Sequence, residues 1–128
     1  MAEIVIDPHP SDEQLRALMQ RAWGQPGPES FRPILARSLV HVGALDAGRL
    51  VGYVNVAWDG GIHAFILDTA VDPDFRRQGI ATAMVIAARD AARARGAECL
   101  HVDFEPHLHG FYSKCGFTDT AAGLIRLK

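Results

Sequence analysis

The sequence predicts a single α+β domain built on a mixed, mainly antiparallel sheet. Its 128 residues are enough to bury one hydrophobic core but too few for two. Hydrophobic residues make up 48% of the chain and charged residues 22%, which is typical of a globular protein rather than a disordered one. Strand patterns joined by turns come first, and a strand, a long helix and another strand follow, an order that favours a mixed sheet. We therefore expect residues 1–128 to form one domain.

Turn and capping signals divide the first half of the chain into its elements. Ser11 is expected to cap a helix, with Gln14 three residues later in the capping-box position. The turn at 46–49 joins two strand patterns into a hairpin, and the turn at 59–61 leads into the next strand. The expected elements are strands at 3–7, 39–45, 50–58 and 64–71, a helix from residue 12 to about 22, and a short helix around 31–37.

The second half is predicted to contain the main helix and the last strands. Ile80, Met84 and Ala88 recur at helical spacing, and Gly96 is the expected C′ residue that ends this helix. The small alanines of the helix would let it lie close to a sheet. The remaining expected elements are a strand at 98–104, a short helix that ends at Gly116, and a terminal hairpin of residues 117–119 and 124–127.

Composition and cysteine usage disfavour several classes of protein. The formal net charge of −2 provides no overall field to attract nucleic acid or a membrane. The opening residues do not resemble a signal sequence, and no apolar run approaches ~18 residues, so we expect a cytoplasmic protein. Cys99 and Cys115 are expected to be small buried residues in a reducing compartment. His101 and His109 lie on strand and turn positions that rarely converge on one ion, so no metal site is expected.

The strongest functional signal lies between Val71 and Ala81. A strand pattern enters this segment and a helix pattern leaves it. The first N–H groups of a helix have no intrahelical partner, and the helix dipole adds positive charge there. Arg76 and Arg77 favour an anionic ligand, and Gly79 removes a side chain where a ligand could approach the backbone. The segment therefore predicts a binding site for a phosphate group.

In this context, the sequence Val-Asp-Pro-x-Phe-Arg-Arg-Gln-Gly-Ile-Ala resembles the acetyl-CoA-binding motif of the GCN5-related N-acetyltransferase (GNAT) superfamily. The core pattern is Arg or Gln, two residues, Gly, one residue, and Gly or Ala, and Arg76, Gly79 and Ala81 meet it. The segment from Phe111 to Phe117 looks like the C-terminal helix end of that family. The resemblance runs roughly from residue 67 to 117. It implies the GNAT fold, a central sheet flanked by helices and splayed between its fourth and fifth strands.

The resemblance also implies where the acetyl donor lies. In the family, acetyl-CoA lies in the splayed region of the sheet. Its pantetheine arm pairs with the end of the first of the two strands, and its diphosphate meets the loop and the helix start. The cofactor-binding residues implied here are Thr69, Ala70, Val71, Arg76, Arg77, Gln78, Gly79, Ile80, Ala81 and Thr82.

Two residues are candidates for acid–base chemistry. The family counterpart of Tyr112 often protonates the departing CoA thiolate, and we favour this acid role; the alternative is a packing role, because Tyr112 lies on an apolar helix stripe. An ammonium group must lose a proton before it can attack a thioester. Asp68 is the first candidate for this base, because it is an acid within an apolar strand, on the face expected to carry Ile66 and Ala70, where burial would raise its pKa. Its alternative role is a structural carboxylate that caps backbone groups.

The acceptor site is the least defined part of the sequence. Glu105 and His107 are candidate substrate residues beside Tyr112. The family often has Asn where Glu105 stands and a small residue where Leu108 stands, so the usual contact from this helix to the CoA arm is in doubt. The aromatic residues Trp23, Trp58 and Phe31 are candidates for an acceptor pocket, although core or rim packing is the more common role for such residues.

Three functional hypotheses remain open. The first is an N-acetyltransferase that moves the acetyl group of acetyl-CoA to a primary amine, on a small molecule or a peptide, by direct attack in a ternary complex. The second is a non-catalytic GNAT-fold module that binds or senses an acyl-CoA. The third is a different phosphate-binding α/β domain. No nucleic-acid or membrane partner is expected, and a homodimer is possible without an identified interface.

Overall fold

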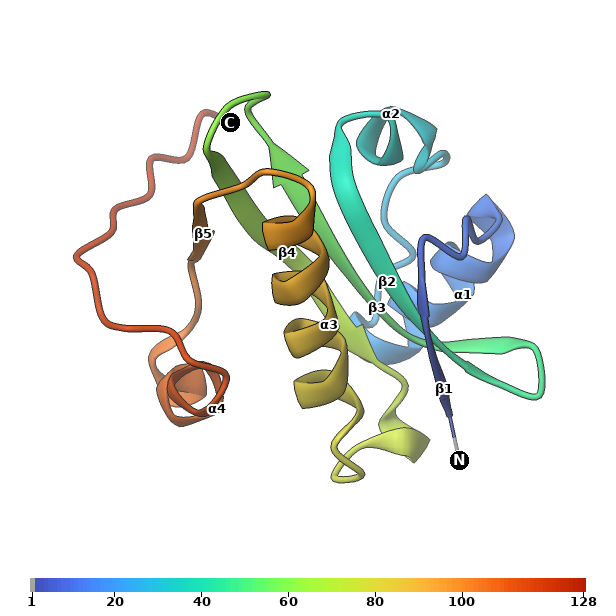
Figure 1. The fold of residues 1–128 in the computed structure, drawn as a ribbon. Helices are drawn as coiled ribbons and strands as arrows, with labels where there is room; N and C mark the ends of the chain where they lie inside the picture. Colours follow the sequence, from blue (N-terminus) through green and yellow to red (C-terminus); the bar gives the residue numbers. More distant parts are fainter. Residues whose placement is uncertain (1) are drawn as a thin grey trace.

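A computed structural model describes residues 2–128 and contains one five-stranded sheet (Figure 1). The strands lie in chain order. The first three pairings are antiparallel, and the fourth, between β4 and β5, is parallel. The strands are β1 (Glu3–Ile6), β2 (Ser38–Asp46), β3 (Arg49–Trp58), β4 (His63–Val71) and β5 (Cys99–Val102). The predicted mixed, mainly antiparallel sheet is confirmed.

Helices cover the two faces of this sheet (Figure 1). The long helix α3 (Ile80–Ala94) crosses one face, and α1 (Asp12–Trp23) and the short α2 (Arg32–Leu35) lie on the other. Single 3-10 turns, η1 (Pro73–Phe75) and η2 (Pro106–Leu108), precede α3 and α4 (His109–Lys114). None of the helices within residues 2–128 is long and apolar enough to cross a membrane.

Each face of the sheet has its own hydrophobic core. On the α3 side, Met84 and Ala88 pack on alternate valines of β2 and β3. A Cβ added to Gly52 of β3 would come within 2.9 Å of the Met84 sulfur. The absence of a side chain at Gly52 therefore lets α3 pack closely on the sheet. On the α1 side, Leu15 and Leu18 pack against Tyr53 and Ala70. The period-2 alternation of the strands separates the two cores.

The predicted helix boundaries are confirmed by their caps. The backbone N–H of Gln14 donates to Ser11 Oγ at 3.1 Å, and the backbone N–H of Ser11 donates to Gln14 Oε1 at 2.9 Å, which completes the capping box. At the other helix, Gly96 follows the last turn with a φ of 104°, a left-handed conformation that ends a helix at low cost in glycine.

Two sequence predictions about the chain end and the cysteines are wrong. The terminal hairpin does not form, because residues 115–128 contain no helix or strand, and Leu124, Ile125 and Leu127 are exposed there. A strand needs a neighbouring strand to satisfy its backbone, which local alternation cannot guarantee. Cys99 is exposed rather than buried, because it lies on the outward face of β5 at the edge of the sheet. Cys115 is buried as expected.

Candidate functional site

The predicted phosphate loop connects β4 to α3 through η1. Gly79 is the N-cap of α3 and has a φ of 78°, and Arg77 also has a positive φ of 63°. The first intrahelical bond runs from the N–H of Ala83 to the Gly79 carbonyl. The N–H groups of Ile80, Ala81 and Thr82 therefore have no acceptor within the helix and are available to a ligand.

A cavity of about 210 Å³ lies at this helix start. Its lining comes from the end of β4, from the loop and from α4. The residues are Val71, Phe75, Arg76, Arg77, Gly79, Ile80, Ala81, Thr82 and Phe111. The predicted diphosphate-binding residues therefore share one cavity, apart from Gln78, which is exposed beside it, while Thr69 and Ala70 lie further back on β4.

The open space in front of Gly79 fits an anionic group. A Cβ built at this position meets no atom within 4 Å, so the backbone faces an empty region. Free N–H groups and the positive end of the α3 dipole face this region, and two exposed arginines, Arg76 and Arg77, line the same cavity. This set of donors suits a diphosphate.

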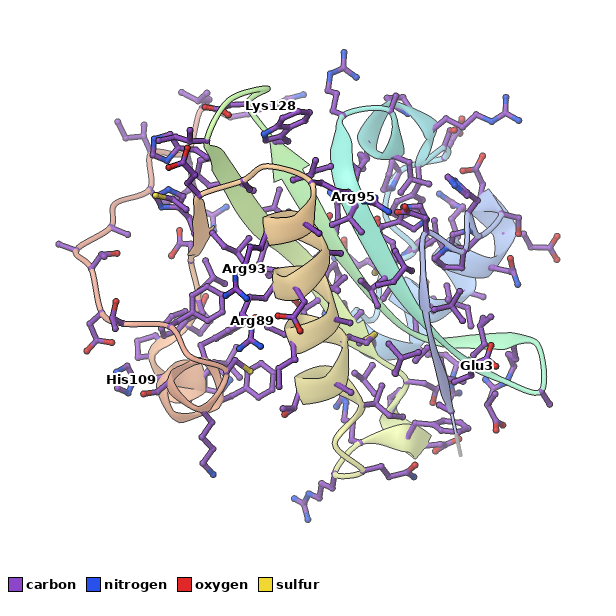
Figure 2. All side chains as sticks on the ribbon, in the orientation of Figure 1. Glu3, Arg89, Arg93, Arg95, His109 and Lys128 are labelled. Atoms are coloured by element: carbon purple, nitrogen blue, oxygen red, sulfur yellow. The ribbon has the colours of Figure 1, made fainter. Side chains whose placement is uncertain are left out.

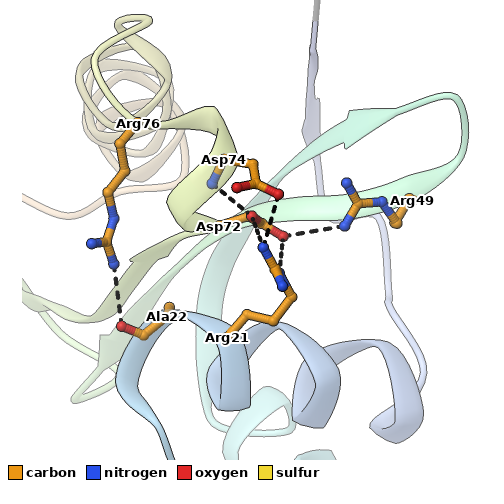
Figure 3. Close-up of polar contacts among 6 residues, drawn as sticks. All are labelled: Arg21, Ala22, Arg49, Asp72, Asp74 and Arg76. Carbon is orange, nitrogen blue, oxygen red and sulfur yellow. Dashed lines mark hydrogen bonds and ion pairs between the residues drawn. The ribbon is translucent and has the colours of Figure 1, made fainter.

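Asp72 anchors the loop to the first half of the chain (Figure 3). Its carboxylate is 1% exposed and accepts from Arg21 Nε at 2.7 Å and from Arg49 Nη1 at 3.1 Å. It also accepts from the backbone N–H of Asp74 at 2.9 Å and so caps η1. Hydrogen bonding from Arg21 is the main cause that lowers the pKa of Asp72 to about 2. The loop between β4 and α3 is thus fixed to α1 and to the β2–β3 hairpin.

A second contact joins the same elements. Arg76 Nη2 donates to the carbonyl of Ala22 at 3.2 Å, near the end of α1 (Figure 3). Arg76 was expected to contact a ligand, but one of its guanidinium nitrogens instead contacts the protein backbone. The other nitrogens of the exposed guanidinium remain free for a ligand.

Replacing Asp72 with Asn is expected to destabilise the protein by about 1–2 kcal/mol at neutral pH. The carboxylate pKa is depressed, so its contribution is present above the unfolded value near 4 and is lost as the pH falls through about 2. Urea unfolding at pH 7 and pH 2 should show a difference between wild type and Asp72→Asn that is much smaller at the lower pH, where about half of the carboxyl is protonated. Asp74→Asn is the matched control, because Asp74 pairs with the same Arg21 but is 75% exposed. A penalty of Asp72→Asn that is unchanged at pH 2 contradicts the assignment.

The sheet opens between β4 and β5 beside this loop. The parallel pairing ends at Ile66 and Val102, whereas β4 continues to Val71. The stretch from Leu67 to Val71 keeps β3 on one edge, and the described pairing with β5 does not extend along the other. The expected splay is therefore present, and it leaves a strand edge to which an extended ligand can bind.

A β-bulge lies in this open stretch. Asn55 of β3 pairs with Leu67, and Tyr53 pairs with Ala70, so β4 contains one extra residue between these points. Asp68 lies in the bulge with a φ of 58°. The expectation that Ile66, Asp68 and Ala70 share one face is wrong, since Ile66 packs on the α3 side and Ala70 on the α1 side. The extra residue reverses the alternation.

The bulge concentrates polar groups in a partly buried place. Asp68 is half-buried, and burial raises its pKa, as the sequence predicts. The hydroxyl oxygens of Tyr53 and Thr69 are buried and have no hydrogen-bond partner among residues 2–128. Burial, with the nearby Asp68 charge, strongly raises the pKa of Tyr53. Tyr53 was not predicted as a site residue, because its strand reads as ordinary core.

Tyr112 lies on α4 in an aromatic cluster. Its side chain is 6% exposed, and its ring stacks on Phe104 at 4.9 Å and contacts Phe111 and Phe117 edge-on. Arg89 extends from α3 toward α4, and its Nη1 would lie 3.8 Å from a Cβ at Gly116 (Figure 2). Tyr112 therefore packs within this cluster. The same contacts hold it next to Phe111, which lines the cavity at the start of α3.

The remaining residues predicted for the acceptor site do not line the cavity at the start of α3. Glu105 and His107 are exposed on either side of the first residue of η2. Phe31 is 3% exposed and belongs to the α1-side core. Trp23 and Trp58 are exposed, and Trp58 Nε1 donates to the Gly61 carbonyl at 2.7 Å. Among residues 2–128 no group of three metal-ligating side chains is present.

Comparison with known families tests the resemblance to the GNAT superfamily. The model of the acetyltransferase (GNAT) family matches residues 7–117, which is most of the chain. The chain belongs to the GNAT acetyltransferase family. Among curated protein sequences, no match was found.

Solved structures agree with this GNAT assignment. A GNAT family acetyltransferase from Streptococcus pneumoniae is 26% identical with a TM-score of 0.82, and the match covers 100% of both chains. A Staphylococcus aureus protein is 24% identical with a TM-score of 0.84, over 100% of this chain and 99% of that one. The GNAT family N-acetyltransferase YhbS of Escherichia coli, in complex with CoA, is 23% identical with a TM-score of 0.75, over 91% of this chain and 68% of that one.

Proposed function

We propose that this GNAT protein transfers the acetyl group of acetyl-CoA to a primary amine by direct attack in a ternary complex. The observation that carries the proposal is the junction of two features. A cavity lined by two arginines at the start of α3 opens beside the stretch of β4 that ends at Val71 and is not paired with β5. A long ligand with a diphosphate and an extended arm suits this pair of sites, and the CoA complex of a structural relative supports that choice.

The residues of this chain divide the binding task. The N–H groups of Ile80, Ala81 and Thr82 and the side chains of Arg76 and Arg77 hold the diphosphate. Backbone groups of Thr69, Ala70 and Val71 pair with the arm as a further strand would. Acetyl-CoA supplies an activated thioester in this position.

Asp68 and Tyr112 are the proposed acid–base pair. The acceptor ammonium gives a proton to Asp68, the amine nitrogen forms a bond to the acetyl carbon, and the carbon–sulfur bond breaks. Tyr112 gives its proton to the departing thiolate and is reprotonated from the nitrogen, which loses its second proton. The sum is one amide, one CoA thiol and one proton released to solvent.

A thiol-release assay tests the proposal. Acetyl-CoA is incubated with the protein and a panel of amines, and free CoA thiol is measured together with the acetylated amine by mass. An enzyme releases thiol in proportion to acetylated product. A binding or sensor module binds acetyl-CoA in a titration but releases none, and tight binding of ATP or NAD without affinity for CoA would support the third hypothesis.

Asp68→Asn is expected to lower kcat/KM for the amine by about a hundredfold. Because Asp68 acts as a base, kcat/KM of the wild type should rise with pH as the Asp68 carboxyl ionises. This rise should lie at a higher pH than for an ordinary aspartate, because burial raises the pKa of Asp68. In the variant, kcat/KM should no longer show this rise and should depend on pH only through ionisation of the amine acceptor. Asp103→Asn is the control, because Asp103 is an exposed acid directly after β5. An unaltered profile in Asp68→Asn leaves this residue only a structural role.

A further inference from the structure

The face of β4 opposite α3 carries a second group of side chains. Ala64 and Ile66 pack into the α3-side core, so strand alternation puts His63, Phe65 and Leu67 on the opposite face. Phe65 is 40% exposed and Leu67 is 45% exposed. Large apolar side chains of this exposure, next to a reaction centre, form a surface for an apolar ligand.

Neighbouring residues on β5 extend this face and make it rigid. The ring of His101 stacks on Phe65, with centroids 4.8 Å apart and an angle of 19° between the planes. His101 Nε2 also lies 2.9 Å from His63 Nδ1. Phe65, Leu67 and His101 are called the aromatic platform below. Its rings are already ordered in the free protein, so binding a flat ligand costs little side-chain entropy.

The bulge supplies a polar end to the aromatic platform. Leu67 is directly followed by the half-buried Asp68, which lies in the bulge between the pairs Asn55–Leu67 and Tyr53–Ala70, beside Tyr53 on the next strand. The buried hydroxyls of Tyr53 and Thr69 have no hydrogen-bond partner among the described residues. Such groups are costly unless a ligand or water satisfies them. An ammonium group, with several N–H donors, satisfies both a carboxylate and a phenol oxygen.

The geometry of the two faces gives the direction of approach. The cofactor cavity is built from the loop, α3 and α4. Pairing between β4 and β5 ends at Ile66 and Val102, so the open stretch of β4 begins at Leu67, within the aromatic platform. We infer that the acceptor is a primary amine carried on a flat apolar body, which lies on the aromatic platform with its ammonium group at Asp68 and Tyr53. This inference rests on the proposed function.

The charges on this face favour such an amine over a polycation. Asp68, in the bulge, is half-buried, whereas Asp103, directly after β5, is exposed to water, which screens its charge. A polyamine or an aminoglycoside would place further hydrated ammonium groups against the apolar part of the platform. A ligand with one ammonium group and one apolar ring instead matches the Asp68 carboxylate and the apolar side chains of Phe65 and Leu67.

Comparing amines in the thiol-release assay tests the inference. The kcat/KM for 2-phenylethylamine is expected to exceed that for spermidine and for neamine by at least about tenfold. Tyr53→Phe should raise KM for 2-phenylethylamine, because it removes the phenol oxygen and keeps the ring. An equal or higher kcat/KM with either polycation overturns the inference and leaves the proposed function intact.

Substitutions on the platform provide a second test. Phe65→Ser and Leu67→Ser are expected to raise KM for 2-phenylethylamine about tenfold without changing the affinity for acetyl-CoA. Ile62→Ser is the matched control, because Ile62 is 44% exposed but precedes β4 at the β3–β4 turn. Analytical ultracentrifugation of the two platform variants provides the contrary outcome. If they change the oligomeric state but not KM, this face binds a second copy of the chain and the inference is wrong.

A binding measurement separates this inference from the proposed function. Chemical-shift changes on adding 2-phenylethylamine report binding without turnover. Shifts at Phe65, Leu67 and Tyr53 without thiol release from any amine would contradict the proposed function and keep the binding site. Absence of these shifts, in the free protein and with acetyl-CoA present, overturns the inference.

Discussion

Replacing Gly79 with Val is expected to weaken acetyl-CoA binding by about ten- to a hundredfold. Gly79 has a φ of 78°, and a β-branched residue pays about 1–2 kcal/mol to adopt this region. The added methyl groups would also stand in the empty space in front of the free N–H groups of α3. Calorimetric titration of the purified variant with acetyl-CoA measures the effect.

Gly96→Val is the matched control for this substitution. Gly96 lies beyond the other end of α3, has a φ of 104°, and a Cβ there also meets no atom within 4 Å. Both variants should lose stability from backbone strain, but only Gly79→Val should lose affinity for acetyl-CoA. Equal affinities in the two variants would show that the ligand does not use this loop.

Replacing Tyr112 with Phe is expected to lower kcat by about a hundredfold and to leave the acetyl-CoA affinity nearly unchanged. The ring keeps its stacking on Phe104, so the fold should persist, and only the proton donor to the thiolate is lost. Steady-state kinetics with the best acceptor and a separate acetyl-CoA titration measure the two quantities.

Phe117→Leu tests whether a change in Tyr112→Phe comes from packing alone. Phe117 contacts the Tyr112 ring edge-on at 5.7 Å, so the substitution disturbs the same cluster without removing a hydroxyl. It should lower the melting temperature and retain most of kcat. A fall in kcat as large as that of Tyr112→Phe would assign Tyr112 a packing role.

Local signals account for the parts of the fold that the sequence predicted well. The capping box of Ser11 and Gln14 and the C′ glycine Gly96 act within one helical turn, so their residues alone define them. The loop around Gly79 is equally local, because a strand, a tight turn and a helix start are consecutive in the chain. The position of the cavity at the start of α3 was therefore predictable from the sequence.

Features that depend on distant partners were not predictable. Asp72 acquires its role from Arg21, 51 residues earlier, and no spacing rule relates the two. The bulge at Asp68 arises from the register with β3, and it changes which face each following residue occupies. The terminal hairpin failed for the same reason, since strand formation depends on a neighbouring strand as well as on alternation.

The position of bound acetyl-CoA is the most direct test of the account. A crystal structure of the protein grown with acetyl-CoA would locate the diphosphate and the arm relative to the loop. We predict diphosphate oxygens within hydrogen-bond distance of the N–H groups of Ile80, Ala81 and Thr82, and the arm alongside β4 from Thr69 to Val71. A diphosphate bound elsewhere, with the cavity at Gly79 left empty, would contradict the account.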